Sequence, residues 1–216
     1  MYPMQGAAAA GTMRLLRTPR RPLSQRSSAL AEHPAHVDDF LPEALRFTAP
    51  APLVDIGANR GQFALAARHV FPQARIVSFE PLAGPAALWR KALAGDDRAR
   101  LIAAAIGPEP GEAQIHLSAR DDSSSLLPIT ERQNALFPGT AAAGTATIRV
   151  VRLADVLPGS EVEAPALLKL DVQGFELQAL AGCEDVLGCF DWAYVECSFV
   201  ELYAGQAFAD EVIAWL

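Results

Sequence analysis

The sequence predicts an α/β fold in which a mostly parallel sheet carries helices on both faces. Short apolar runs of strand length alternate with longer segments of helical periodicity, which is typical of a parallel sheet with crossover helices. The chain has 216 residues, of which 51% are hydrophobic, and this suffices for one core without disulfides or metals. With no internal repeat, we expect a single domain.

The alternating elements follow one another in the first half of the chain. We expect strands at 53–56, 75–79 and 101–106, because each is a brief apolar run. A helix at 62–71 has apolar residues at helical spacing and stops at Pro72, and a second helix runs through Leu88, Trp89 and Leu93. A short helix over 37–47 precedes them and ends before Pro50.

The second half is less regular at first and then returns to the same pattern. Strands are expected at 114–117 and 145–152, around a polar, Ser-rich stretch. After them we expect a buried strand at 167–171, a helix at 175–187, a strand at 192–196 and a helix at 208–216.

The charge is distributed unevenly along the chain. Five arginines precede the first acidic residue, Glu32, whereas the whole chain has a net charge of −7. We expect residues 1–36 to be a disordered basic tail and residues 37–216 to be the folded domain. An acidic body has no broad basic face for a nucleic-acid backbone, so a nucleic-acid partner is not expected.

Cysteine content and hydropathy bear on the compartment. Three cysteines, Cys183, Cys189 and Cys197, cannot all pair, and none forms a C-x-x-C motif, which favours a reduced cytoplasmic protein. No apolar run is long enough for a membrane span. The oligomeric state is left open.

The sharpest motif is the segment 54–63, with the sequence VDIGANRGQF. A strand delivers Asp55 and then turns through Gly57 and Gly61 into a helix, at the edge of the sheet where ligands bind. A dinucleotide site would require G-x-G-x-x-G, whereas the spacing here is G-x-x-x-G. A carboxylate repels a phosphate but suits a ligand with an ammonium and a sulfonium, which favours S-adenosylmethionine over NAD.

Two further motifs end other strands of the predicted sheet. Glu80, in the sequence SFEP, is placed to accept hydrogen bonds from both ribose hydroxyls of an adenosine cofactor, or is simply a solvated carboxylate. In LKLDVQGFE, Lys169 and Asp171 share one face of a strand. A buried lysine must be paired, and Asp171 or Glu196 is the expected partner, either in an active site or in a structural salt bridge.

These three motifs, in this order, resemble the FkbM family of S-adenosylmethionine-dependent methyltransferases from about Leu53 to Leu216. The resemblance implies a Rossmann-like class I methyltransferase fold and methyl transfer to a hydroxyl of a sugar, glycan or natural product. It implies a small-molecule or glycan acceptor and S-adenosyl-L-methionine as cofactor. The residues it implies for cofactor binding are Asp55, Gly57, Asn59, Gly61, Glu80, Pro81 and Ala105.

The family's pattern and this sequence differ at two places. Family members often have a polar residue where Ala104 precedes Ala105, Ile106 and Gly107. Family chains also continue into two more strands after the last helix, so we expect a domain that lacks its last two strands.

The expected mechanism depends on carboxylates, because none of the four histidines lies in the motifs. Asp171 is the candidate base or orienting group, Lys169 would stabilise the developing alkoxide, and Glu196 would tune that lysine. We expect no metal ligands, although Asp171 and Glu196 could together hold Mg²⁺. Two alternatives remain: an NAD(P)-binding oxidoreductase and an inactive remnant that binds S-adenosylmethionine.

Overall fold

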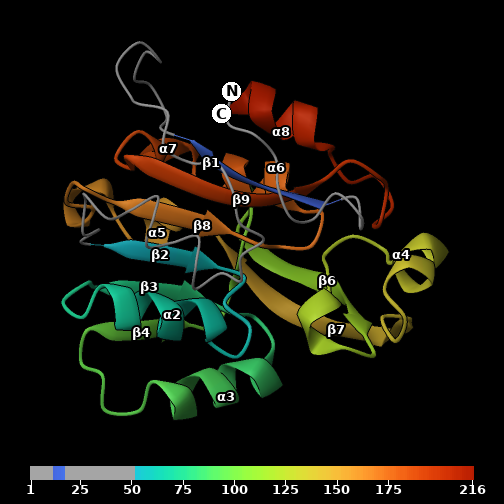
Figure 1. Cartoon of the computed structure of the whole chain (residues 1–216), viewed down its shortest axis with the longest axis horizontal. Helices are drawn as coiled ribbons and strands as arrows, with labels where there is room; N and C mark the ends of the chain where they lie inside the picture. Colours follow the sequence, from blue (N-terminus) through green and yellow to red (C-terminus); the bar gives the residue numbers. More distant parts are fainter. Residues whose placement is uncertain (1–11, 18–51) are drawn as a thin grey trace.

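The computed structural model describes residues 12–17 and 52–216, and its centre is a six-stranded sheet in the order β1-β9-β8-β2-β3-β4 (Figure 1). All neighbours in this sheet are parallel except β1 and β9, which are antiparallel. The predicted α/β fold with a mostly parallel sheet is therefore confirmed. The strands of this sheet are β1 (Thr12–Arg17), β2 (Leu53–Ile56), β3 (Ile76–Phe79), β4 (Ala99–Ile102), β8 (Leu167–Leu170) and β9 (Trp192–Ser198).

The position of β2 determines where a ligand site can form. β2 lies between β3, which follows it in the chain, and β8, which comes more than a hundred residues later. The strand order thus reverses at β2. In an open parallel sheet, ligands bind in the crevice outside the carboxyl ends of the strands at such a reversal.

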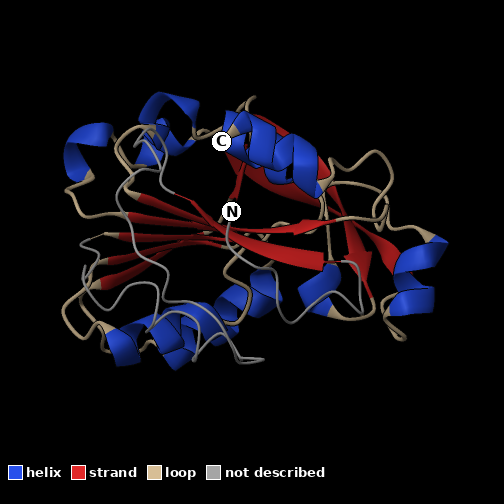
Figure 2. Ribbon diagram, turned by 45° about the horizontal axis from the view of Figure 1, so that its top comes forward, coloured by secondary structure: helices blue, strands red, loops and turns tan. Residues whose placement is uncertain are grey.

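Helices cover both faces of the large sheet (Figure 2). On one face, α2 (Gln62–Val70) and α3 (Ala83–Ala92) bury Phe63 and Trp89 against the strands. The other face packs against α5 (Leu153–Val156), α6 (Glu176–Ala181), α7 (Glu184–Leu187) and α8 (Ala209–Trp215). Leu53 belongs to the first core and Val54 to the second, because successive strand residues point to opposite faces.

A second, three-stranded sheet has the order β5-β7-β6, with β5 (Ala105–Ile106), β6 (Gly111–Ser118) and β7 (Ala142–Val151). The single strand expected at 101–106 is therefore wrong, because it belongs to two sheets. β4 ends at Ile102, the amide of Ala104 donates to the Ile102 carbonyl, and β5 then pairs with β7. In this way the small sheet is joined to the carboxyl-end edge of the large one.

The expected helix at 175–187 is also divided, into α6 and α7. Between them Gly182 lies against the backbone of Gly107, and a Cβ there would be 2.5 Å from the Gly107 carbonyl oxygen. The Ser-rich stretch contains a short 3₁₀ helix, Asp121–Ser123, and then α4 (Glu131–Leu136). Thr130 caps α4 by accepting a hydrogen bond from the Gln133 amide.

The N-terminal region differs from the expected disordered tail in one respect. Thr12–Arg17 form β1, which pairs along β9 from Thr12 with Ser198 to Arg17 with Ala193, so the tail prediction is wrong for these residues. Pairing satisfies the backbone groups on the outer edge of β9, which would otherwise be open. The rest of the tail and the helix expected at 37–47 lie outside the described residues.

Two other expectations concern cysteines and membrane spans. Cys183, Cys189 and Cys197 are all free. In the part of the chain that the structure describes, no helix combines the length and the apolar character needed to cross a membrane.

Candidate functional site

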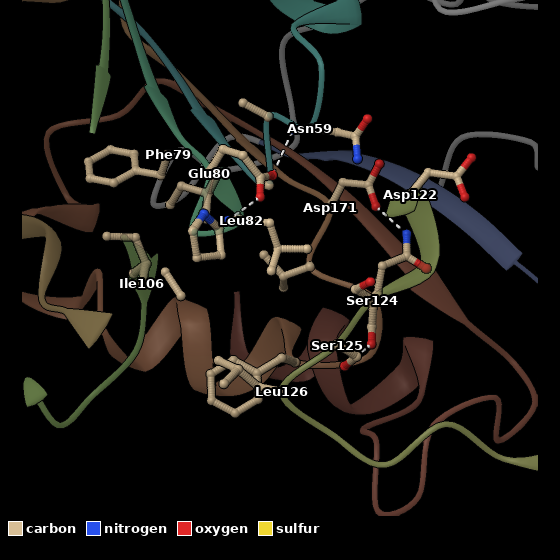
Figure 3. A pocket seen from close by; sticks show the side chains of 18 of the residues that line it. Asn59, Phe79, Glu80, Leu82, Ile106, Asp122, Ser124, Ser125, Leu126 and Asp171 are labelled. Carbon is tan, nitrogen blue, oxygen red and sulfur yellow. Dashed lines mark hydrogen bonds between the residues drawn. The ribbon is translucent and has the colours of Figure 1, made fainter. Parts of the chain in front are cut away.

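A cavity of about 250 Å³ lies at the carboxyl ends of β2, β3 and β8, where the strand order reverses. Its walls come from the loops after these strands, from β5, and from the segment Asp121–Leu126, which we call the 121–126 turn. In the view of Figure 3, Glu80 lies on one side with Phe79 and Ile106, and Asp171 lies on the other with Asp122 and Ser124. Both sheets therefore contribute to the site.

Most of the residues singled out from the sequence line this cavity. They are Gly57, Asn59, Glu80, Pro81, Ala105, Lys169 and Asp171. Asp55, Gly61 and Glu196 lie outside the lining. Asp55 has no exposed surface at all, so its carboxylate does not face the cavity as the sequence led us to expect.

Glu80 is a buried carboxylate at the end of β3, only 5% exposed. Its Oε2 accepts from the Asn59 amide at 2.9 Å and its Oε1 from the Leu82 amide at 2.7 Å. Burial raises the pKa of Glu80, and these two backbone hydrogen bonds oppose the rise. The carboxylate is thus held rigidly, with lone pairs left to accept hydrogen bonds from a ligand.

Gly57 and Gly61 are required by the protein itself. Gly57 has φ +78°, and a Cβ there would lie 1.8 Å from the carbonyl oxygen of Asp171, so the loops after β2 and β8 touch through their backbones. Gly61 has φ +91° and would place a Cβ 2.9 Å from Cδ1 of Trp89. The first contact brings the two loops together in the wall of the cavity.

Lys169 is paired with Asp55, and not directly with Asp171 or Glu196 as predicted. The two residues are in-register neighbours on β8 and β2, and Lys169 Nζ lies 2.8 Å from Asp55 Oδ1. Nζ also donates to the Gly57 carbonyl at 2.8 Å and lies 5.5 Å from the centre of the Phe63 ring. The ammonium therefore joins β8 to the glycine loop that follows β2.

Electrostatics keep Lys169 charged in spite of its burial. Burial lowers the pKa of Lys169, but the charges of Asp55, Asp171 and Glu196 outweigh it, and the pKa is raised. Burial raises the pKa of Asp55, and Lys169 opposes that rise. Glu196, although outside the lining, therefore acts on Lys169 through its charge.

Asp171 is connected to two residues that we did not assign to the site from the sequence. The side-chain amide of Gln173 donates to Asp171 Oδ1 at 2.7 Å, and the Tyr203 hydroxyl lies 2.7 Å from Gln173 Oε1. Gln173 stands in the LDVQG block, but nothing in the local sequence indicates its link to Tyr203, thirty residues later in the chain.

The 121–126 turn is attached to the large sheet by polar contacts. Arg60, in the loop after β2, forms an ion pair with Asp121 at 2.8 Å, and its side chain is 53% exposed. Ser125 Oγ donates to the backbone carbonyl of Gln173 at 2.6 Å. The turn thus forms a wall that is fastened to both loops of the large sheet.

The lining is acidic, with four carboxylates and a lysine that is already paired with Asp55. Asp121 is paired with Arg60 and Asp122 with Arg120, so Glu80 and Asp171 are the two carboxylates of the lining that favour a cationic ligand over an anionic one. Within the described residues, no group of three or more His, Cys, Asp or Glu side chains is arranged to hold a metal ion. The arrangement suits a positively charged ligand and places the Asp171 carboxylate beside it.

Comparisons with known proteins agree with this geometry. The model of the methyltransferase FkbM domain matches residues 55–216. The chain is 30% identical over 164 residues to the 2-O-methyltransferase NoeI of Sinorhizobium fredii, covering 73% of this chain and 68% of that protein. It is 28% identical to the 31-O-demethyl-FK506 methyltransferase FkbM of Streptomyces tacrolimicus (75% and 69% covered) and 26% identical to the methyltransferase sdnD of Sordaria araneosa (76% and 71%).

Proposed function

The chain belongs to the FkbM family of methyltransferases, and from this premise we propose that it transfers the methyl group of S-adenosylmethionine to a hydroxyl of a sugar, glycan or natural product. One observation carries the proposal: Glu80 and the Gly57 loop meet at one acidic cavity, at the reversal point of the sheet. Two of the relatives are named for methylation at an oxygen, which supports a hydroxyl acceptor.

The cavity suits this cofactor on three counts. The Glu80 carboxylate stands ready for a ribose diol, Gly57 lines the cavity without a side chain, and apolar Ile106 offers a surface for a base. The acidic lining favours a net positive ligand. Bound S-adenosylmethionine would supply a methyl group on a positively charged sulfur, which is a good leaving group.

We propose that Asp171 receives the proton of the acceptor hydroxyl. Gln173 occupies Oδ1 of Asp171, which leaves Oδ2 for the acceptor. Asp171 Oδ2 would take the hydroxyl proton as the acceptor oxygen bonds to the methyl group, and the electron pair of the broken methyl–sulfur bond would leave with the sulfur. The main contribution of the protein is alignment of the oxygen with the methyl group.

We propose a narrower role for Lys169 than the sequence suggested. Its ammonium donates to the Gly57 carbonyl and faces Asp55, so it holds the glycine loop in place and adds a positive charge beside the site. Glu196 strengthens that charge by raising the pKa of Lys169. Both are positioning residues in this scheme.

The acidic lining also supports an uncharged acceptor over a phosphorylated or carboxylated one. A cytoplasmic location is part of the proposal and is supported by the three free cysteines.

The first test is cofactor binding measured by calorimetry with S-adenosylmethionine, its demethylated product and NAD. We expect the first two to bind, and Glu80→Gln to weaken both by about tenfold, because one charged hydrogen-bond acceptor for the ribose is lost. Glu112→Gln, at an exposed position of β6 away from the cavity, is the matched control. Binding of NAD alone would refute the proposal.

The second test identifies the acceptor class. The enzyme is incubated with labelled S-adenosylmethionine and either neutral methyl pyranosides or their phosphates, and labelled product is counted. Methylation of the phosphates in preference to the neutral sugars would contradict the expected selectivity.

A further inference from the structure

We infer that Tyr203 positions Asp171 by holding the side-chain amide of Gln173 in place from its oxygen end. This inference rests on the proposed function, because it concerns the carboxylate that we assign to the acceptor proton. It names Tyr203 and Gln173 as positioning residues that the sequence did not identify.

The chain of hydrogen bonds has a definite direction. An ionised Asp171 can only accept, so the Gln173 amide must turn its NH₂ group toward Oδ1, and the two atoms are 2.7 Å apart. Gln173 Oε1 is then left facing the Tyr203 hydroxyl, also at 2.7 Å, and the same hydroxyl lies 3.1 Å from the Ser123 carbonyl oxygen. The Tyr203 hydroxyl therefore donates to Gln173 Oε1, its shorter contact, and the Gln173 NH₂ group donates to the Asp171 carboxylate.

Without the Tyr203 hydroxyl, Gln173 Oε1 loses its donor and the amide is held only by its bond to Asp171. The Gln173 side chain can then swing, and the Asp171 carboxylate rotates with it out of its present position. Tyr203 thereby sets the position of the Asp171 carboxylate indirectly, through Gln173.

Two observations show that the arrangement is built and not incidental. Tyr203 is only 2% exposed, although it stands on the loop between β9 and α8, outside the sheet. Gln173 adopts φ +56°, an uncommon conformation for a residue other than glycine, and Ser125 Oγ holds its carbonyl at 2.6 Å. This uncommon backbone conformation places the Gln173 side chain between Tyr203 and Asp171.

The test uses two cofactor analogues and needs no acceptor. In sinefungin an amine-bearing carbon replaces the methylated sulfur, so its affinity relative to the demethylated product, S-adenosylhomocysteine, reports a negative charge beside the methyl position. We expect Tyr203→Phe and Gln173→Met each to reduce the preference of the wild-type protein for sinefungin by about tenfold, as for loss of one charged hydrogen bond. Affinity for S-adenosylhomocysteine should stay within about twofold of wild type.

The double variant separates positioning from simple loosening of the loop. If Tyr203 acts only through Gln173, then Tyr203→Phe has no further effect in the Gln173→Met background. Thr130→Val is the matched control: Thr130 Oγ1 donates to the Leu202 carbonyl at 2.7 Å, which anchors the same loop without any link to Asp171. It should leave the sinefungin preference unchanged.

The outcomes are distinct. Additive effects in the double variant, an unchanged preference in Tyr203→Phe, or an equal loss in Thr130→Val would each overturn the inference. A wild-type protein that binds S-adenosylhomocysteine but shows no preference for sinefungin would overturn it as well. Failure to bind any adenosyl compound would instead refute the proposed function.

Discussion

Replacing Lys169 by methionine should lower the unfolding free energy by about 3–5 kcal/mol, because Asp55 would be left as a buried, unpaired charge. Lys169 Nζ and Asp55 Oδ1 are 2.8 Å apart, with side chains 6% and 0% exposed. At that separation their attraction is about 6 kcal/mol for an effective dielectric constant near 20. Removing each ion from water costs several kcal/mol, so in the intact pair this cost is nearly offset by the attraction between the two charges. When one partner is removed, the desolvation cost of the other is no longer offset.

Urea unfolding, followed by the fluorescence of the tryptophans, measures this loss. The double variant Asp55→Val with Lys169→Met should recover most of the stability, since an apolar pair needs no counter-charge. Arg60→Ala serves as the comparison: its ion pair with Asp121 has the same 2.8 Å separation, but Arg60 is 53% exposed, so the loss should stay below about 1 kcal/mol.

The pH dependence gives a second check on the same variant. Burial raises the pKa of Asp55, so in Lys169→Met the folded protein can take up a proton that the unfolded chain has released. The loss should therefore shrink as the pH falls from about 8 toward 5. A loss of less than about 1 kcal/mol at pH 8, or no recovery in the double variant, would refute the reasoning.

Three more predictions concern single positions. Gly57→Ala should lower the unfolding free energy in urea by more than about 3 kcal/mol and weaken cofactor binding, because the new Cβ would overlap the Asp171 carbonyl. Gly95→Ala, also at positive φ but in open space, should lower it by only about 1 kcal/mol. Equal losses would contradict the close contact. Burial raises the pKa of Glu176 to about 8, so between about pH 5 and 8 the folded state keeps a proton that the unfolded state loses. The unfolding free energy should therefore fall, as the pH rises through this range, by up to about 1.4 kcal/mol per pH unit. Glu176→Gln should remove that slope in unfolding curves taken across this range, and an unchanged slope would assign it to another group. Arg68→Ala should cost about 1–2 kcal/mol, since this side chain pairs with Asp96 and donates to three carbonyls at the end of α2; a loss too small to measure in urea would mean that these bonds only replace bonds to water.

The sequence was sufficient for the elements whose pattern is local. β2, α2 and β3 fall within one residue of the expected ranges, because each shows its own periodicity and ends at a turn residue or proline. α3 contains Leu88 and Trp89, through which a helix was expected. The expected strand at 101–106 and helix at 175–187 failed for a different reason. Their breaks depend on pairing with β7 and on the approach of Gly182 to Gly107, which are contacts between distant segments.

The site shows the same division. Glu80 and Asp171 were recognisable because Glu80 directly follows a predicted strand and Asp171 is the last residue of another. Asp55 and Lys169 are each the third residue of a four-residue strand, and their pairing follows once β2 and β8 are known to be neighbours in register. That adjacency joins segments separated by more than a hundred residues, so no local pattern reveals it. The link from Tyr203 to Asp171 was hidden in the same way.

The composition of the cavity wall has a practical consequence for changing what the enzyme accepts. The loops after β2 and β8 are in backbone contact at Gly57, so neither can be altered without disturbing the other. The 121–126 turn comes from the small sheet and contributes the side chains of Asp122, Ser124 and Leu126 to the cavity. A library randomised at these three positions, with Ser125 retained, would explore new acceptors while leaving the strand ends of the large sheet intact.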